Sequence, residues 1–135
     1  MKVLKIYIAS SWKNQHAIEM LTDILRAKGH TVFSFVENNY SEGHGAEKPV
    51  NFEEWVLTDK AIQSFKYDTD GATRNDLVIY IGPSGTDAWA EIGAAWGSGV
   101  PIYGLWAKGE PAGLMRKMVE WFSDYRELLR IVENW

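Results

Sequence analysis

Two acidic side chains, Asp87 and Glu91, lie four residues apart just after a Gly-Pro-Ser-Gly turn at 82–85. If this segment is helical, residues four apart share one face, so the two carboxylates lie side by side. Paired carboxyl groups can move protons, or one of them can attack an electrophilic carbon. A structural interpretation is equally open at this point, in which Asp87 caps the helix and Glu91 interacts favourably with the helix dipole.

Strands and helices alternate around this turn. Buried or β-branched runs predict strands at 3–9, 31–36, 77–81, 102–106 and, as a final edge strand, 120–122. Apolar spacing predicts helices at 12–28, 52–65, 86–98, 111–119 and 125–134. This order predicts a three-layer α/β/α fold with a mostly parallel, four- to five-stranded doubly wound sheet, Rossmann- or flavodoxin-like, as one domain over residues 1–135.

Two polar segments interrupt the pattern. The segment 67–75 is turn-rich, and 37–49 reads as a long loop with two glycines. Ligands bind open parallel sheets at the carboxyl ends of the strands. Because 37–49 follows a strand at that edge, we expect it to be a mobile cover over the site.

The composition excludes several classes of protein. Hydrophobic residues are 46% of the chain, charged residues 24% and the net charge is −4, which is globular and argues against binding polymeric nucleic acid or an anionic membrane. The chain has no cysteine, so thiolate catalysis, iron–sulfur clusters and disulfides are excluded. No apolar run is long enough for a transmembrane helix, and Lys5 interrupts the apolar start, so we expect a cytoplasmic protein.

Known nucleotide and metal motifs are absent. The first turn has no G-x-G-x-x-G, no P-loop occurs, and no acid follows the first strand as a receiver domain requires. The phosphate loop of a flavin carrier is also missing. The three histidines, at 16, 30 and 44, lack metal-ligand spacing. We therefore expect neither a metal nor a cofactor.

The chain resembles the nucleoside 2-deoxyribosyltransferase family, which includes nucleotide N-glycosidases, over most of its length. The resemblance rests on Glu91-Ile92-Gly93, on Gly99-Val100-Pro101 before a strand, and on the opening strand and turn at 6–12 with its Tyr7. Asp68, eight residues before Asp76, matches an active-site Asp of the family. One departure is that Gly85 stands where many members carry an Asp, six residues before the Glu.

The resemblance implies cleavage or transfer at the N-glycosidic bond of a (deoxy)nucleoside or nucleoside 5′-monophosphate. Glu91 is then the nucleophile that forms a glycosyl-enzyme intermediate, which water or a second base resolves. Asp68 or Asp87 would supply a proton to the leaving base, and Tyr7 would hold Glu91 by a hydrogen bond. Tyr7 is otherwise a core aromatic residue with a satisfied hydroxyl.

Residues of the turns at the carboxyl ends of the strands are candidates to bind the substrate. Serine hydroxyls and backbone N–H groups there can donate to a 5′-phosphate, and a tryptophan can stack on the base, although core packing explains any one tryptophan equally well. The candidates are Ser10, Ser11, Trp12, Gly82, Ser84, Gly85 and Trp89.

Two other functions stay open, namely an NAD-type glycohydrolase and a nucleotide-binding module without turnover. We also expect a homo-oligomer, at least a dimer, because seven tryptophans are more than one small core readily absorbs. Trp96, Trp121 and Trp135 are the candidates for the interface, and Trp135 is a candidate to reach the site of a partner.

Overall fold

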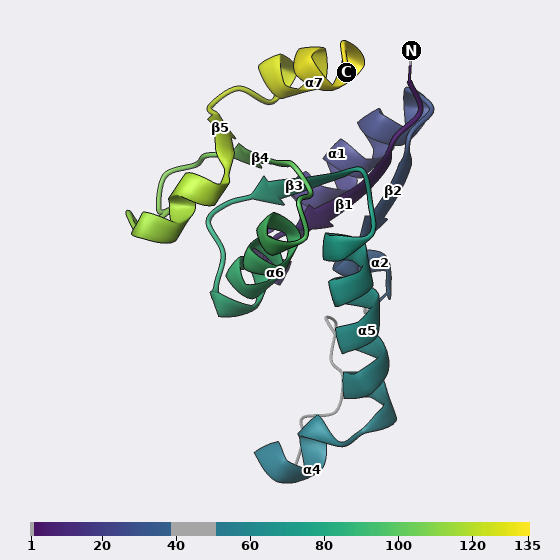
Figure 1. Ribbon diagram of the computed structural model, residues 1–135, viewed down its shortest axis with the longest axis vertical. Coiled ribbons are helices and arrows are strands. Elements are labelled where there is room, and N and C mark those ends of the chain that lie inside the picture. Colours follow the sequence, from purple (N-terminus) through teal and green to yellow (C-terminus); the bar gives the residue numbers. More distant parts are fainter. Residues whose placement is uncertain (1, 39–50) are drawn as a thin grey trace.

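Five parallel strands form the centre of the structure, a computed structural model that describes residues 2–38 and 51–135 (Figure 1). They are β1 Lys5–Ala9, β2 Thr31–Ser34, β3 Leu77–Ile81, β4 Ile102–Leu105 and β5 Glu120–Phe122. Their order in the sheet is β2-β1-β3-β4-β5, and every pairing is parallel. The order reverses between β1 and β3, and the strand at 120–122 lies at the edge. The expected doubly wound α/β/α fold is therefore confirmed.

Helices cover both faces of the sheet (Figure 1). The helices α1 Gln15–Ala27 and α7 Tyr125–Glu133 pack on one face, and α5 Asp59–Thr73 and α6 Thr86–Gly97 pack on the other. Because both faces are covered, all five residues of β3 are buried, as is usual for a central parallel strand. Shorter helices complete the chain: η1 Trp12–Asn14, α2 Phe35–Asn38, α4 Phe52–Val56 and η2 Leu114–Met118.

Two predictions are wrong, the single helix at 52–65 and the turn at 67–75. The helical conformation is interrupted at Leu57. Thr58 caps a new helix by accepting from the backbone N–H of Ala61 (3.2 Å), and this helix, α5, continues to Thr73. Its polar residues fit a helix because Asp70 pairs with Lys66 four residues before it (2.8 Å). Asp68 therefore projects from a helix rather than from a turn.

Smaller differences occur elsewhere. The strand predicted at 31–36 ends at Ser34, where α2 begins, and the helix predicted at 111–119 is the 3₁₀ helix η2. The helix after β3 begins at Thr86, and its N-cap is Gly85 rather than an acidic residue. Residues 39–50, which hold most of the expected cover, lie outside the described residues.

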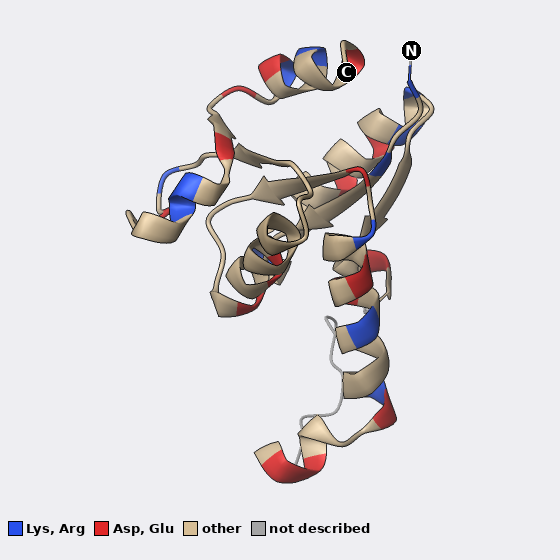
Figure 2. Cartoon of the chain, viewed as in Figure 1, with Lys and Arg blue, Asp and Glu red and all other residues tan. Residues whose placement is uncertain are grey.

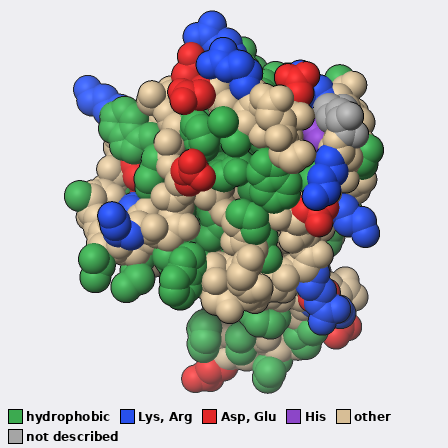
Figure 3. Space-filling view, turned by 45° about the horizontal axis from the view of Figure 1, so that its top comes forward, with side chains coloured by type: hydrophobic (Ala, Val, Ile, Leu, Met, Phe, Trp, Pro, Cys, Tyr) green, Lys and Arg blue, Asp and Glu red, His purple; other side chains and the backbone are tan. Residues whose placement is uncertain are grey.

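A limb, formed by residues 52–65 of α4 and the first half of α5, extends away from the sheet (Figure 1). Its apolar side chains are unusually exposed: Phe52 by 72%, Leu57 by 76% and Phe65 by 70%. In the space-filling view, hydrophobic side chains are exposed in the lower part of the molecule, where the limb lies (Figure 3). The rest of α5 returns to the sheet and packs against α6.

Gly71 allows this return. It is buried on α5, and a Cβ placed there would collide with the ring of Tyr7 in β1. Tyr7 is itself fully buried, so its ring has no space into which it can move. The close approach of α5 to the sheet therefore depends on a glycine at this position.

We expect Gly71→Ala to lower the free energy of unfolding by about 1–3 kcal/mol, because overpacking a filled core costs this much. Gly97→Ala is the matched control, since a Cβ at the end of α6 meets no atom within 4 Å. Urea denaturation of both variants measures the difference. Equal stabilities would contradict the packing argument.

Candidate active site

A buried tyrosine holds a carboxylate between the sheet and the helix above it. Tyr7 lies in β1 with no exposed surface, and its side chain belongs to the core on the α5–α6 side. Its hydroxyl donates to Oε1 of Glu91 at 2.6 Å. Glu91 is half-buried on α6, and its second oxygen has no hydrogen-bond partner among the described residues. The tyrosine thus fixes one oxygen of the carboxylate and leaves the other without a hydrogen bond from the described residues.

Asp68 joins this pair from α5. Burial is the main cause of the raised pKa of the Tyr7 phenol, and the carboxylates of Glu91 and Asp68 raise it further by charge and hydrogen bonding. Three elements, β1, α5 and α6, therefore bring Tyr7, Asp68 and Glu91 together although they are far apart in sequence.

The pKa of the Glu91 carboxyl is raised well above its ordinary value. Burial raises its pKa to about 8; the hydrogen bond from Tyr7 opposes this rise, and the negative charges of Asp68 and Asp87 add to it. A carboxyl with a pKa near the working pH can serve as an acid, a base or a nucleophile.

Asp87 contributes through its charge. It is exposed in the first turn of α6, one turn before Glu91. The N-cap of α6 is Gly85, so Asp87 lies inside the helix and the expected cap by Asp87 is not present. The two carboxylates share a helix face, as their spacing predicted.

The turns after β1 and β3 lie against each other. Ser10 is buried and donates its hydroxyl to the carbonyl of Ile81 at 2.6 Å. Asn14, which sequence reasoning missed, donates to Oγ of Ser10 (3.0 Å) and to the carbonyl of Pro83 (2.8 Å). Ser11 instead caps η1 by accepting from the backbone N–H of Lys13.

A second tyrosine–glutamate pair, Tyr80 and Glu110, lies on the same side of the sheet. We call this pair and its partners Ser84, Trp89 and Arg116 the Tyr80 network. The hydroxyl of Tyr80 donates to Oε1 of Glu110 at 2.5 Å and accepts from Nε1 of Trp89 at 3.0 Å. Ser84 Oγ lies 2.7 Å from the same hydroxyl. Glu110, whose side chain is 1% exposed, forms an ion pair with Arg116 at 3.0 Å.

This network explains two of the residues expected to bind substrate. A Cβ on Gly82 would collide with Glu110 Oε1, so the glycine makes room for the buried carboxylate. The Trp89 indole lies under the guanidinium of Arg116, with 4.1 Å from its Cζ to the ring centroid. Trp89 is thus engaged within the protein. Sequence reasoning assigned no role in the site to Glu110 or Arg116, because neither lies in a catalytic motif or in an apolar pattern.

Trp12 lies apart from Glu91. Its ring packs edge-on against Phe35 at 5.3 Å, next to the core on the opposite side of the sheet from Tyr7. Among the candidates, Ser10 therefore bonds to the turn after β3, and Ser84 and Trp89 belong to the Tyr80 network. Trp12 does neither.

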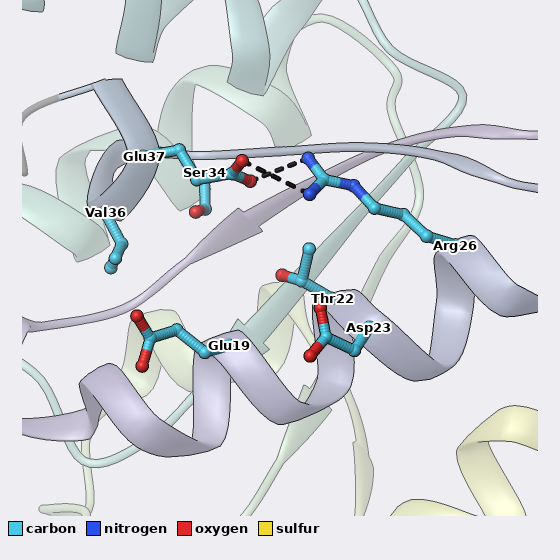
Figure 4. A pocket seen from close by; sticks show the side chains of 7 residues that line it. All are labelled: Glu19, Thr22, Asp23, Arg26, Ser34, Val36 and Glu37. Atoms are coloured by element: carbon cyan, nitrogen blue, oxygen red, sulfur yellow. Dashed lines mark hydrogen bonds and ion pairs between the residues drawn. The ribbon is translucent and has the colours of Figure 1, made fainter.

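A cavity of about 360 Å³ lies elsewhere, between α1 and the β2–α2 segment (Figure 4). Arg26 and Glu37 form an ion pair in it at 2.6 Å. It is lined by Glu19, Thr22, Asp23, Arg26, Ser34, Val36 and Glu37. None of the residues expected to act on a substrate lies in it.

The described residues contain no cluster of His, Asp and Glu that is arranged to hold a metal ion. His30 serves the core, because its Nδ1 accepts from the backbone N–H of Leu4 at 3.1 Å. No helix within 2–38 or 51–135 is long and apolar enough to cross a membrane.

No protein-family model matches the sequence, and a search of curated proteins finds no match. Solved structures do match. A 2-deoxyribosyltransferase from Bacillus psychrosaccharolyticus is 26% identical with a TM-score of 0.70, and the match covers 92% of this chain and 89% of that one.

Two further structures share the fold. A CMP N-glycosidase from Clostridium botulinum is 22% identical, with a TM-score of 0.61 and coverage of 96% and 98%. A conserved protein from Enterococcus faecalis is 15% identical, with a TM-score of 0.64 and coverage of 98% and 99%. The resemblance to the nucleoside 2-deoxyribosyltransferase family, first indicated by Tyr7, Asp68 and the Glu91 motif, is therefore confirmed at the level of structure.

Proposed function

We propose that this chain is an enzyme that cleaves or transfers the N-glycosidic bond of a nucleoside or nucleotide, with Glu91 as the nucleophile. The observation that carries the proposal is the hydrogen bond from buried Tyr7 to Glu91, which orients a carboxylate with a pKa of about 8. The likeness to a 2-deoxyribosyltransferase along nearly the whole chain supports the same chemistry.

The reaction follows from this arrangement in two steps. The free oxygen of Glu91 attacks C1′ of the sugar, the C1′–N bond breaks, and its electron pair leaves with the base. A carboxylic acid, Asp68 or Asp87, gives a proton to the leaving base. Water or a second base then attacks C1′ from the opposite side and gives its proton to the carboxylate that protonated the leaving base. The ester bond breaks, Glu91 leaves as a carboxylate, and the configuration at C1′ is retained overall.

Tyr7 and Asp68 serve different parts of this reaction. Tyr7 is a positioning residue, because its hydroxyl donates to the Glu91 oxygen that does not attack. Asp68 raises the pKa of the Tyr7 phenol and the pKa of the Glu91 carboxyl by its negative charge. Asp87, one turn before Glu91 and exposed, is the alternative proton donor; comparing Asp68→Asn with Asp87→Asn separates the two.

Glu91→Gln is expected to lower the rate by at least about 10³-fold, because a neutral amide cannot form the glycosyl ester. Base release by chromatography, from nucleosides, nucleoside 5′-monophosphates and NAD, measures the loss and identifies the substrate class. Near-wild-type turnover would refute the mechanism.

Glu127→Gln is the matched control, since Glu127 is an exposed carboxylate on α7, across the sheet from Glu91. If NAD is the only one of these compounds that is cleaved, with release of nicotinamide, the result would favour the glycohydrolase instead. Binding of nucleotides without any bond cleavage would favour the non-catalytic module.

The rate should also depend on pH in a predictable direction. Because the pKa of Glu91 is raised to about 8, the carboxyl is increasingly protonated below this pH and the nucleophilic fraction falls. We expect log kcat/KM to rise with pH up to about 8, as the nucleophilic carboxylate forms.

Tyr7→Phe removes a hydrogen bond that lowers the pKa of Glu91, so the rising limb should move to higher pH. Tyr125→Phe, an exposed tyrosine on α7, should leave the profile in place. A flat wild-type profile between pH values of about 6 and 9, where such a carboxyl titrates, would contradict the assignment.

We further propose that the chain forms a homo-oligomer. Trp96 is 62% exposed and Trp106 is 52% exposed, and the limb presents further apolar side chains. Trp135 is engaged within its own chain, because its Nε1 donates to the hydroxyl of Tyr103 at 2.7 Å. The limb, rather than the last residue, is therefore the better candidate for an interface.

Light scattering tests this assembly. We expect a mass of at least twice 15.3 kDa, and a shift toward the monomer in Phe65→Glu, which puts a charge on the limb. Met20→Glu, at an equally exposed apolar residue on α1, is the control. A single 15.3 kDa species in the unmodified protein would refute the proposal.

A further inference from the structure

We propose that the cavity between α1 and the β2–α2 segment is a second binding site, and that its ligand is a small aliphatic diamine. The cavity has a volume of about 360 Å³, which lies within the range of small-molecule sites. The helix α1 packs on the face of the sheet opposite to α5 and α6, and Glu91 does not line the cavity. The proposal therefore stands apart from the proposed reaction.

A buried hydroxyl without a partner lies in the wall of this cavity. Ser34 ends β2, is 1% exposed and lines the cavity. Its backbone is held in place, because β2 pairs with β1 and the carbonyl of Ser34 accepts from the hydroxyl of Tyr67 at 3.2 Å. The Ser34 hydroxyl itself has no hydrogen-bond partner within residues 2–38 and 51–135. Buried polar groups are normally paired, so this hydroxyl is available to a group that enters the cavity.

Two carboxylates on α1 line the same space. Acidic positions are visible on this helix in Figure 2, and Glu19 and Asp23, four residues apart, share one of its faces. In Figure 4 both project from α1 on the side where Ser34 lies. Asp23 forms no ion pair with any described residue. Glu19 is approached by the amide of Gln15 (3.4 Å) and the imidazole of His16 (3.6 Å), but by no Lys or Arg of the described chain.

The one cation among the described residues that line the cavity is already neutralised. Arg26 donates to the two carboxylate oxygens of Glu37 at 2.6 and 3.2 Å, and its Nη2 also donates to the carbonyl of Val32 at 2.8 Å. Glu37 thus balances the charge of Arg26, and the charges of Glu19 and Asp23 remain. A concave surface with charges of one sign attracts counter-ions. A cation therefore suits this cavity better than an anion.

The surroundings favour an organic cation over a metal ion. No group of His, Asp and Glu in the described part of the chain is arranged to hold a metal. An ammonium group carries three N–H donors and no acceptor, so it matches carboxylates and a hydroxyl oxygen that can accept. One ammonium can pair with Glu19 and a second with Asp23, one of them also donating to Ser34. The methylene chain between them can pack against Val36, an apolar residue of the lining.

Isothermal titration calorimetry with 1,4-diaminobutane tests the proposal. At low ionic strength we expect one saturable site per chain, with a dissociation constant of about 1 mM or lower. Butylamine, which has one ammonium, should bind about 3- to 10-fold more weakly, and the uncharged 1,4-butanediol should not bind. Absence of saturable binding of the diamine overturns the proposal. Tighter binding of Mg²⁺ than of the diamine at this site also overturns it.

Variants of the lining place the ligand. Asp23→Asn, Glu19→Gln and Ser34→Ala should each weaken binding of the diamine by about 3- to 10-fold, because each removes one acceptor or one charge. Glu127→Gln, at an exposed carboxylate on α7 that does not line the cavity, should leave the affinity unchanged. Equal losses in Asp23→Asn and Glu127→Gln would show only general attraction to a protein of net charge −4, and would overturn the proposal.

The candidate active site is also acidic, so the experiment has to distinguish the two places. Glu91→Gln removes a carboxylate from that site and should leave the affinity for the diamine unchanged. In NMR spectra, we expect the diamine to shift the backbone amide signals of 19–26 and 34–37 rather than those around Asp68 and Glu91. A loss of binding in Glu91→Gln, with none in Asp23→Asn, would place the diamine in the candidate active site and overturn the proposal.

Inorganic phosphate tests the opposite charge. Because Glu37 already neutralises Arg26, we expect no binding of phosphate in the cavity at concentrations at which the diamine saturates. Binding of phosphate that is lost in Arg26→Gln would show that the cavity is an anion site, and would overturn the proposal.

Discussion

The hydrogen bond between Tyr7 and Glu91 is the constraint on which the site depends. A carboxyl group that is half-buried against a sheet is costly to ionise, and burial is the main reason that its pKa rises to about 8. The 2.6 Å bond from Tyr7 opposes this cost and gives the carboxylate one orientation. Tyr7 can do so because it lies in a strand that is covered on both faces, where its ring cannot move. The precision of the site thus comes from the core.

The close packing of α5 follows from the same constraint. Gly71 lets the helix approach the Tyr7 ring, and this approach carries Asp68 to the pair. A bulkier residue at 71 would therefore displace an acidic side chain as well as a helix. Packing and electrostatics cannot be separated here, because one helix supplies both the contact and the charge.

The sequence predicted those parts of the structure that depend on local pattern. The strand at 77–81 is an unbroken apolar run, and the spacing of Asp87 and Glu91 is a helical one; both are found as predicted. The helix around Asp68 was missed because its residues are polar. Lys66 and Asp70 form an ion pair that fits a helix, but polar residues of this kind show no periodic apolar pattern from which a helix is predicted. Glu110 was missed because it meets Tyr80 from 30 positions away, across a segment without a regular pattern.

The two tyrosine–glutamate pairs show why one carboxylate is suited to chemistry and the other to structure. Tyr80 and Tyr7 both donate short hydrogen bonds to a glutamate on the same side of the sheet. Glu110 is almost fully enclosed, and Arg116 balances its charge and occupies its second oxygen. Glu91 is only half-buried, its second oxygen has no partner among the described residues, and the charges that act on it are negative. A buried charge that is fully paired gains nothing from reacting. In the proposed reaction, a carboxylate that is held by one bond and raised in energy by like charges is stabilised when it forms a neutral ester with a sugar carbon.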